Sequence, residues 1–192
     1  MKTIGLTGGI GSGKSVVSNL LGIMGIPVYD SDKEAKKITS NSPVIRDCLS
    51  KKFGTELYQD GVLNKSLLSS LIFGDKENLA FVNAIIHPEV QKDFVKWAEL
   101  HKDSSFVAVE SAILFESGFN KIADVTINVS APLERRIERV KKRDQSSREH
   151  ILNRINNQMS EEERTQKSDY TIINDDYLAV LPQIEYLLKQ LN

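Results

Sequence analysis

Gly8-Gly9-Ile10-Gly11-Ser12-Gly13-Lys14-Ser15 is the stretch that decides the fold of this chain. Read from its first glycine, it is G-x-x-x-x-G-K-S, the pattern of a phosphate-binding P-loop. The glycines let the main chain wrap around a polyphosphate with its N–H groups pointing inward. Lys14 supplies a positive charge for the β- and γ-phosphates, and Ser15 places a hydroxyl where Mg²⁺ would bridge them. The pattern therefore predicts a site for a nucleotide polyphosphate and its metal ion.

The residues around this loop have the context that the mechanism requires. Residues 2–7 are short, apolar and suited to a β-strand, and residues 17–24 carry apolar side chains at i, i+3, i+4 and i+7, which is one face of a helix. Gly25 follows as a helix stop signal. The alternative is a flexible Gly/Ser linker that matches by chance, and the strand and helix signals on either side argue against it.

Composition sets the class of protein. A chain of 192 residues with 40% apolar residues suits one α/β domain with insertions. A net charge of −1 provides no global basic field for nucleic acid or an anionic membrane. Cys48 is the only cysteine, so neither an intrachain disulfide nor a CxxC metal site is possible. There is no run of eighteen apolar residues and no signal-peptide pattern. We expect a soluble, cytoplasmic monomer or small homo-oligomer.

A helical insertion is predicted after the second strand, residues 26–30. The pattern Ser31 to Glu34 resembles a capping box and predicts a helix start. From about residue 40 to residue 101 the signals are nearly all helical, which favours an all-helical insertion beside the sheet. One of its helices should cover residues 77–86 and be interrupted by His87-Pro88, because a residue before proline avoids the α region.

Three further strands and a lid complete the predicted fold. Apolar, β-capable stretches occur at residues 105–110, 123–129 and 169–174. A basic helix follows Pro132, and capping-box patterns starting at Ser146 and Ser160 predict two short helices. Pro182 should kink the last helix or delay its start.

The fold class is therefore α/β, a three-layer P-loop parallel sheet with a helical insertion and a helical lid. The predicted boundaries are a core of residues 1–32, 104–134 and 168–192, an insertion of residues 33–103 and a lid of residues 135–167.

Phosphoryl transfer needs a group that orients the acceptor hydroxyl and takes its proton. Asp32 is the best candidate, since it lies at the carboxyl end of a strand, where open α/β sheets place their ligands. An equally good interpretation is that the Asp32 carboxylate stabilises the start of a helix through the helix dipole. Asp30 has the same two interpretations, or it helps to coordinate hydrated metal. Glu110 ends an apolar strand, the place of an acid that holds Mg²⁺ directly or through water, although a strand-end carboxylate is common.

Basic residues between positions 135 and 148 are candidates for a phosphate clamp, because the arginine fork binds oxyanions in a bidentate way. For most of them a solvated helix face is the better interpretation. Arg139 and Arg143 lie four residues apart and share a face, so these two, with Arg148, are the predicted lid residues.

The chain also resembles a known family, the dephospho-CoA kinases. The motifs that carry the resemblance in order and spacing are residues 6–15, 21–25, 28–32, His87-Pro88, 113–116, Arg143-Asp144, 148–150, Gln158 and 168–174. They span essentially the whole chain. The P-loop alone is generic, whereas this ordered set is specific.

The resemblance implies transfer of the γ-phosphate of ATP, with Mg²⁺, to the ribose 3′-hydroxyl of dephospho-coenzyme A, the last step of coenzyme A synthesis. It implies Asp32 as the base, acting with Lys14 and Arg143. It implies acceptor binding by the insertion, with His87 nearby and Lys36 in place of a frequent family arginine. The ATP-binding set is Gly8, Gly9, Ile10, Gly11, Ser12, Gly13, Lys14, Ser15, Val16, Arg143 and Asn174. Val16 replaces a threonine that is usual in the family, and Ser15 and Glu110 are the expected metal ligands.

Two other functions fit the P-loop itself. One is a kinase that acts on a nucleoside monophosphate or a similar metabolite, which the loop cannot distinguish. The other is a regulatory nucleotide switch, but the Asn-Lys-x-Asp and Asp-x-x-Gly strings expected of a GTPase do not occur.

Overall fold

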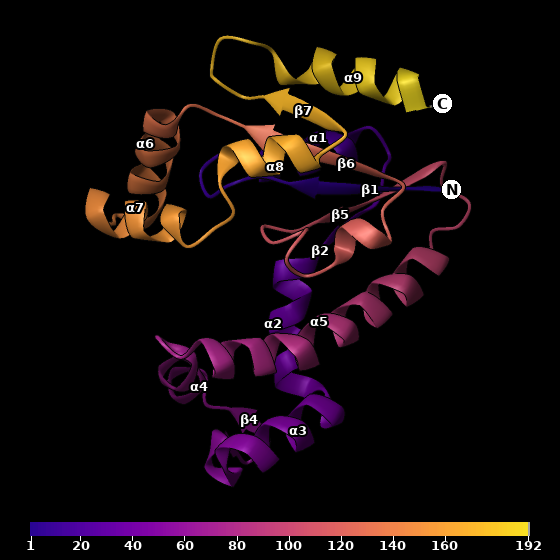
Figure 1. Cartoon of the computed structure of the whole chain (residues 1–192). Helices are drawn as coiled ribbons and strands as arrows, with labels where there is room; N and C mark the ends of the chain where they lie inside the picture. The colour runs from indigo at the N-terminus through magenta and orange to yellow at the C-terminus, as the bar shows by residue number, and fades with distance from the viewer. Residues whose placement is uncertain (192) are drawn as a thin grey trace. The chain divides into compact units, whose positions relative to one another are not determined.

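The computed structural model describes residues 1–191, which fold as two compact units (Figure 1). The first, here called the P-loop unit, consists of residues 1–29 and the chain from His101 onward. The second, the inserted unit, consists of residues 30–100. Each unit has its own apolar core.

A five-stranded sheet forms the centre of the P-loop unit. Its strands, in spatial order, are β2 (Val28–Asp30), β5 (Phe106–Glu110), β1 (Lys2–Thr7), β6 (Val125–Ser130) and β7 (Tyr170–Ile173). The pairs β1–β5, β1–β6 and β6–β7 are parallel, with Leu6 opposite both Glu110 and Ile127. The carboxyl end of β1, where the P-loop begins, therefore lies between the carboxyl ends of two neighbouring strands, the edge at which such sheets bind ligands.

Helices flank this sheet, as predicted. They are α1 (Lys14–Ile23), the short η2 (Phe119–Lys121), α6 (Leu133–Asp144), α7 (Arg148–Asn156), α8 (Glu161–Lys167) and α9 (Val180–Leu191). Helices α1 and α9 pack against each other, α9 also contacts β7, and α8 packs against β6 (Figure 1). The buried core between them consists of Ile4, Leu6, Val17, Leu21, Ile26, Phe106, Ala108, Val125, Ile127, Val129, Ile172, Ile184, Leu187 and Leu188.

The inserted unit is mainly helical but contains a hairpin. Its elements are α2 (Ser31–Asn41), α3 (Pro43–Phe53), η1 (Thr55–Leu57), β3 (Tyr58–Gln59), β4 (Val62–Leu63), α4 (Lys65–Ile72) and α5 (Lys76–Glu99). Asp60 and Gly61 connect its two strands with φ of 49° and 79°, as a two-residue hairpin connection requires. The expectation of an all-helical insertion is wrong, because Tyr58 and Leu63 join the core of this unit from strands of two residues each, too short to show a periodicity of two.

Helix α5 runs without interruption through Pro88, so the expected break at His87-Pro88 is also wrong. Proline inside a helix removes one hydrogen bond and costs roughly 3 kcal/mol. Apolar residues on both sides of it, Val82 before and Val90 and Phe94 after, are buried. Burial of that continuous apolar face outweighs the local cost.

Two helix starts differ from the sequence patterns by one residue. Asp30, rather than Ser31, caps α2 by accepting a hydrogen bond from the N–H of Lys33 at 2.9 Å. Ser147, rather than Ser146, caps α7. In each case the acceptor three residues before the free N–H is the cap, and the neighbouring serine lies outside that spacing.

The other two predictions of helix starts agree with the structure. Ser160 caps α8 as predicted, through the N–H of Glu163. Pro182 lies in the first turn of α9, which begins at Val180, so it marks the start of the helix without breaking it, because first-turn N–H groups have no partner within the helix. No helix in the described part of the chain combines the length and the apolar character needed to span a membrane.

Candidate active site

The P-loop connects the end of β1 to the start of α1, which begins at Lys14. Gly13 has φ of 96° and is followed directly by this helix. A side chain at Gly13 would place its Cβ 2.0 Å from the Nδ2 atom of Asn174, so both the backbone and the packing require glycine there. Lys14 folds back over the loop, where its Nζ donates a hydrogen bond to the carbonyl of Gly8 at 2.8 Å.

Two observations indicate that the loop suits a polyphosphate. Ser12 is fully buried, and among residues 1–191 its Oγ has no hydrogen-bond partner, which is unusual for a buried hydroxyl. Ser15 and Val16, in the first turn of α1, are exposed. A buried hydroxyl, an exposed hydroxyl, a lysine ammonium and a helix N-terminus together form a donor set that suits phosphate oxygens.

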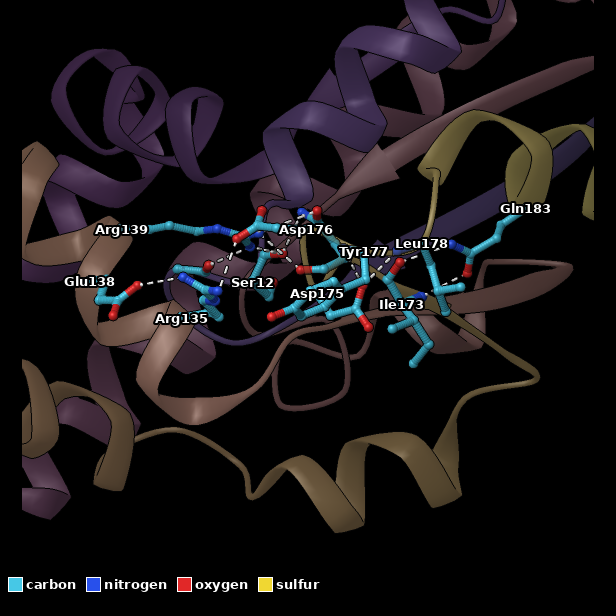
Figure 2. A network of polar contacts seen from close by, with 12 residues as sticks. Ser12, Arg135, Glu138, Arg139, Ile173, Asp175, Asp176, Tyr177, Leu178 and Gln183 are labelled. Atoms are coloured by element: carbon cyan, nitrogen blue, oxygen red, sulfur yellow. Dashed lines mark hydrogen bonds and ion pairs between the residues drawn. The ribbon is translucent and has the colours of Figure 1, made fainter.

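A network of polar contacts holds the loop against the segment between β7 and α9 (Figure 2). Asn174 is buried and donates from Nδ2 to the carbonyl of Ser12 at 2.9 Å. Arg139, from α6, donates to the carbonyls of Asn174 at 3.0 Å and Ser12 at 3.3 Å, and pairs with Asp176 at 2.5 Å. The side chain of Asn174 therefore contacts the P-loop itself. Its expected part in ATP binding stays a prediction.

The segment after Asn174 is itself ordered by an aspartate. The carboxylate of Asp175 accepts hydrogen bonds from the N–H groups of Tyr177 at 2.9 Å and Leu178 at 2.8 Å. These backbone hydrogen bonds, that of Leu178 first, hold the pKa of Asp175 below its usual value, because they favour the charged form. These hydrogen bonds order the segment of the chain beside the P-loop.

Glu110 lies at the carboxyl end of β5, directly opposite Leu6 of β1. Its Oε2 accepts a hydrogen bond of 2.5 Å from the hydroxyl of Ser18 on α1. Ser18 is buried, so this contact sets the direction of the carboxylate. In residues 1–191 no group of three or more His, Cys, Asp or Glu side chains gathers at a metal-binding spacing. Mg²⁺ is usually bound by one or two protein oxygens, with water and substrate phosphate oxygens as its other ligands.

The expected lid arginines pair with carboxylates near them in the fold. Arg143 donates to Asp144 at 2.6 Å and is 62% exposed, and Asp144 also accepts from Arg154 at 2.7 Å. Hydrogen bonds from Arg143 and then Arg154 hold the pKa of Asp144 well below its usual range. Arg148 pairs with Glu134 at 2.8 Å. Of the three predicted lid arginines, only Arg139 contacts the P-loop carbonyls.

The remaining candidates belong to the inserted unit. Asp32 and Lys36 are exposed and lie four residues apart on α2, so they share one face of that helix. His87 is half-buried in the middle of α5. Their roles toward an acceptor stay predictions.

Comparison with known proteins decides the family. A family model described as dephospho-CoA kinase matches residues 2–179. The dephospho-CoA kinase of Bacteroides fragilis strain YCH46 is 47% identical over 96% of this chain and 90% of its own length. That of Porphyromonas gingivalis is 45% identical over 98% and 94%. The chain belongs to the dephospho-CoA kinase family.

Solved structures agree with this fold. A protein from Thermus thermophilus, TT1252, has a TM-score of 0.85 at 36% identity and covers all of this chain, which covers 98% of it. The dephospho-CoA kinase of Campylobacter jejuni has a TM-score of 0.70 at 23% identity, again over the whole chain and 98% of its own. A shikimate kinase from Acinetobacter baumannii, at 0.54 and 16% over 93% of its length, shares the fold of P-loop kinases.

Two residues that sequence reasoning did not assign to the site contact the P-loop of this dephospho-CoA kinase family member. Arg136 is buried and donates from Nε to the carbonyl of Ile10. Gln158 accepts from the N–H of Ile10. The signal for Arg136 was present, because it precedes Val140 by four residues on the apolar face of α6, where a solvated arginine is not expected. Gln158 lies in the linker between α7 and α8 and carries no periodic signal.

A cavity of about 870 Å³ lies beside these two residues, within the P-loop unit. Its lining combines the β6–α6 turn, the α7–α8 linker and the end of β7. Apolar side chains including Pro132, Leu133, Met159 and Ile173 form much of its wall. Residues of the predicted lid region and the end of β7, an edge strand of the sheet, therefore line the same cavity.

Proposed function

We propose that the chain transfers the γ-phosphate of ATP to the ribose 3′-hydroxyl of dephospho-coenzyme A, with Asp32 as the base. Membership of the dephospho-CoA kinase family supports the reaction. The observation that carries the site is the P-loop, with Lys14 at its end and the buried Ser12 hydroxyl within it. Positioning and charge neutralisation are the main demands of phosphoryl transfer, and this loop supplies both.

The reaction then follows from ordinary acid–base chemistry. The Asp32 carboxylate accepts the proton of the ribose 3′-hydroxyl as the oxygen attacks the γ-phosphorus. The bond between the γ-phosphorus and the β–γ bridging oxygen breaks, and ADP leaves with that oxygen. Lys14 neutralises charge that develops on the phosphates. Exposure of Asp32 in the first turn of α2 supports this role, because a base must reach its substrate.

Ser15 and Glu110 would hold Mg²⁺ together with phosphate oxygens. The carboxylate of Glu110 is aimed by Ser18, and a hard oxygen donor set of this kind suits the ion. When bound, Mg²⁺ supplies charge neutralisation at the β- and γ-phosphates. The protein's part is to fix the hydroxyl and the carboxylate at the ends of neighbouring elements.

The inserted unit binds the acceptor in this proposal. Lys36, on the same face of α2 as Asp32, meets an anionic part of the acceptor, and His87 contacts it from α5. Arg143 leaves Asp144 to meet ATP phosphates from the lid of residues 135–167. Both substrates are small molecules, and a net charge of −1 supports the absence of nucleic-acid or membrane partners. The chain acts as a cytoplasmic monomer or small homo-oligomer.

An acceptor panel tests the reaction. The protein is incubated with Mg-ATP and either dephospho-coenzyme A or AMP, and products are separated by chromatography. We expect a 3′-phosphorylated product from dephospho-coenzyme A only. Preference for AMP would identify a nucleoside monophosphate kinase instead, and nucleotide-dependent partner binding without any transfer would indicate a switch.

Replacing Asp32 with Asn tests the base. We expect turnover to fall by roughly 10²–10⁴, with ATP affinity little changed, since Asn cannot accept the proton. Asp47→Asn is the matched control, because Asp47 is also an exposed aspartate of the inserted unit. Equal turnover in Asp32→Asn and wild type would exclude Asp32 as the base.

A further inference from the structure

Ile10, at the tip of the P-loop, is held on three sides. Its N–H donates to the Oε1 atom of Gln158 at 2.9 Å. Its carbonyl accepts from the Nε atom of Arg136 at 3.0 Å. Its side chain packs against the α6–α7 cluster formed by Ile137, Val140 and Ile151. Both polar groups of one residue are therefore satisfied by side chains from α6 and from the α7–α8 linker.

Burial and an ion pair hold Arg136 in this position. Its side chain is 5% exposed and pairs with Glu161 of α8 at 3.6 Å. Burial lowers the pKa of Arg136, and Glu161 partly offsets the effect. A Cβ on Gly9 would lie 2.2 Å from the guanidinium, so the loop approaches Arg136 as closely as glycine allows.

A second buried arginine holds the linker that carries Gln158. Arg164 is 1% exposed and donates to the carbonyl of Met159, the residue after Gln158, at 2.5 Å. It also pairs with Glu161 at 3.0 Å, and Glu161 accepts from Asn128 of β6 at 2.9 Å. A continuous set of contacts thus runs from the sheet through α8 to Gln158.

These contacts decide which way the loop's donors point. The N–H of Ile10 is taken by Gln158, so it is not one of the groups that bind phosphate. In a trans peptide the carbonyl of one residue points opposite to the N–H of the next, and the described chain has no cis bonds. Because Arg136 holds the carbonyl of Ile10, the N–H of Gly11 faces away from α6.

We propose that Gln158 is a positioning residue of the phosphate cradle. Together with Arg136, it holds the N–H and the carbonyl of Ile10. It thereby fixes the orientation in which the N–H groups of the following residues meet a nucleoside triphosphate. The proposal rests on ATP as the nucleotide of the proposed function. It assigns to the linker between α7 and α8 a direct part in nucleotide binding through the main chain of the P-loop.

Gln158→Leu removes the acceptor while keeping a side chain of similar length. We expect amide hydrogen exchange at Ile10 to become at least tenfold faster. We expect the Kd for Mg-ATP, measured by calorimetry without acceptor, to rise about tenfold, with kcat at saturating ATP within about twofold. Gln166→Leu is the matched control, since Gln166 is an exposed glutamine on α8; both measurements should stay at wild-type values.

Gln158→Glu keeps an oxygen acceptor at the same reach and separates positioning from general packing. It should restore slow exchange at Ile10; only the exchange rate is compared, because the added charge itself repels phosphate. Unchanged exchange and unchanged ATP affinity in Gln158→Leu would overturn the proposal, as would fast exchange in Gln158→Glu. Because ATP affinity is measured without an acceptor, failure to phosphorylate dephospho-coenzyme A would refute the proposed reaction and leave this test valid.

Discussion

Helix α6 uses arginine in opposite ways near its start and at its end. Arg136 and Arg139, within its first seven residues, hold carbonyls of the P-loop at 3.0 to 3.4 Å. Arg143, at the far end, is 62% exposed and pairs with its neighbour Asp144. A buried guanidinium held by several partners is a structural part of the loop, whereas an exposed one held by a single carboxylate exchanges partners at little cost. All three residues are arginines, and their burial and partners decide which of them support the loop.

Lys14→Ala should reduce phosphoryl transfer more than any of the arginine variants, because Lys14 is the one cation of the P-loop that is expected to contact the nucleotide. We expect phosphoryl transfer to fall by roughly 10²–10³, measured as kcat/KM for Mg-ATP. Lys142→Ala, at an exposed lysine of α6, is the control. Transfer within twofold of wild type in Lys14→Ala would refute the entire account of the site.

Arg136→Leu tests the buried arginine near the start of α6. It removes the partner of the Ile10 carbonyl and one partner of Glu161. We expect the free energy of unfolding to fall by ~3 kcal/mol, measured by urea denaturation, and the KM for ATP to rise. A change in unfolding free energy below about 0.5 kcal/mol would show that Arg136 does not support the loop.

Arg143→Ala tests the exposed arginine at the end of α6. We expect the free energy of unfolding to change by less than about 0.5 kcal/mol, because Arg154 still pairs with Asp144. We expect kcat/KM for Mg-ATP to fall about tenfold, the effect of one charge-assisted contact to phosphate. Arg136→Leu should change both activity and stability, whereas Arg143→Ala should change activity and leave stability nearly unchanged. A loss of stability without a loss of activity in Arg143→Ala would reverse the comparison.

The pH dependence of stability gives a smaller effect. Arg143, followed by Arg154, depresses the pKa of Asp144 from its ordinary 3.8. The stabilisation is therefore fully present above that value and is lost as pH falls toward the depressed pKa. We expect the Tm difference between wild type and Asp144→Asn to be constant from pH 7 to about pH 5 and to shrink below pH 4. A difference that grows with acidity would contradict the assignment.

Arg148→Ala should have the smallest effect. Arg148 pairs with Glu134, and both side chains are more than half exposed, at 53% and 64%. Exposed ion pairs of this kind contribute little, so we expect Tm and kcat/KM to stay at wild-type values. A tenfold loss of kcat/KM would instead place Arg148 among the residues that bind ATP.

Much of the fold was predictable because its signals are local. The P-loop glycines, the apolar strands and the helical stripes each lie within a few residues, and the structure has the strands and helices that they predict. The parts that were mispredicted depend on contacts across the chain. The β3–β4 hairpin forms because Tyr58 and Leu63 pack onto the helices of the inserted unit, and α5 survives Pro88 because residues on both sides of it are buried.

The same distinction holds for the site. Lys14 and Ser15 follow from the motif alone. The support of the loop by Asn174 bridges 162 residues between Asn174 and Ser12, and that by Gln158 bridges 148 residues to Ile10. No sequence spacing reveals such pairs. Arg139 donates to the loop's carbonyls, a contact that the sequence did not predict, and its expected role in phosphate binding stays a prediction.

The order of strands in the sheet carries a lesson for protein engineering. Strands β2 and β5 are neighbours, yet the chain between them is the whole inserted unit. Every strand pair that frames the P-loop is formed by β1, β5, β6 and β7, outside that segment. In the proposed function, acceptor choice can therefore be altered by exchanging one continuous segment of the chain, without replacing the strands that frame the P-loop.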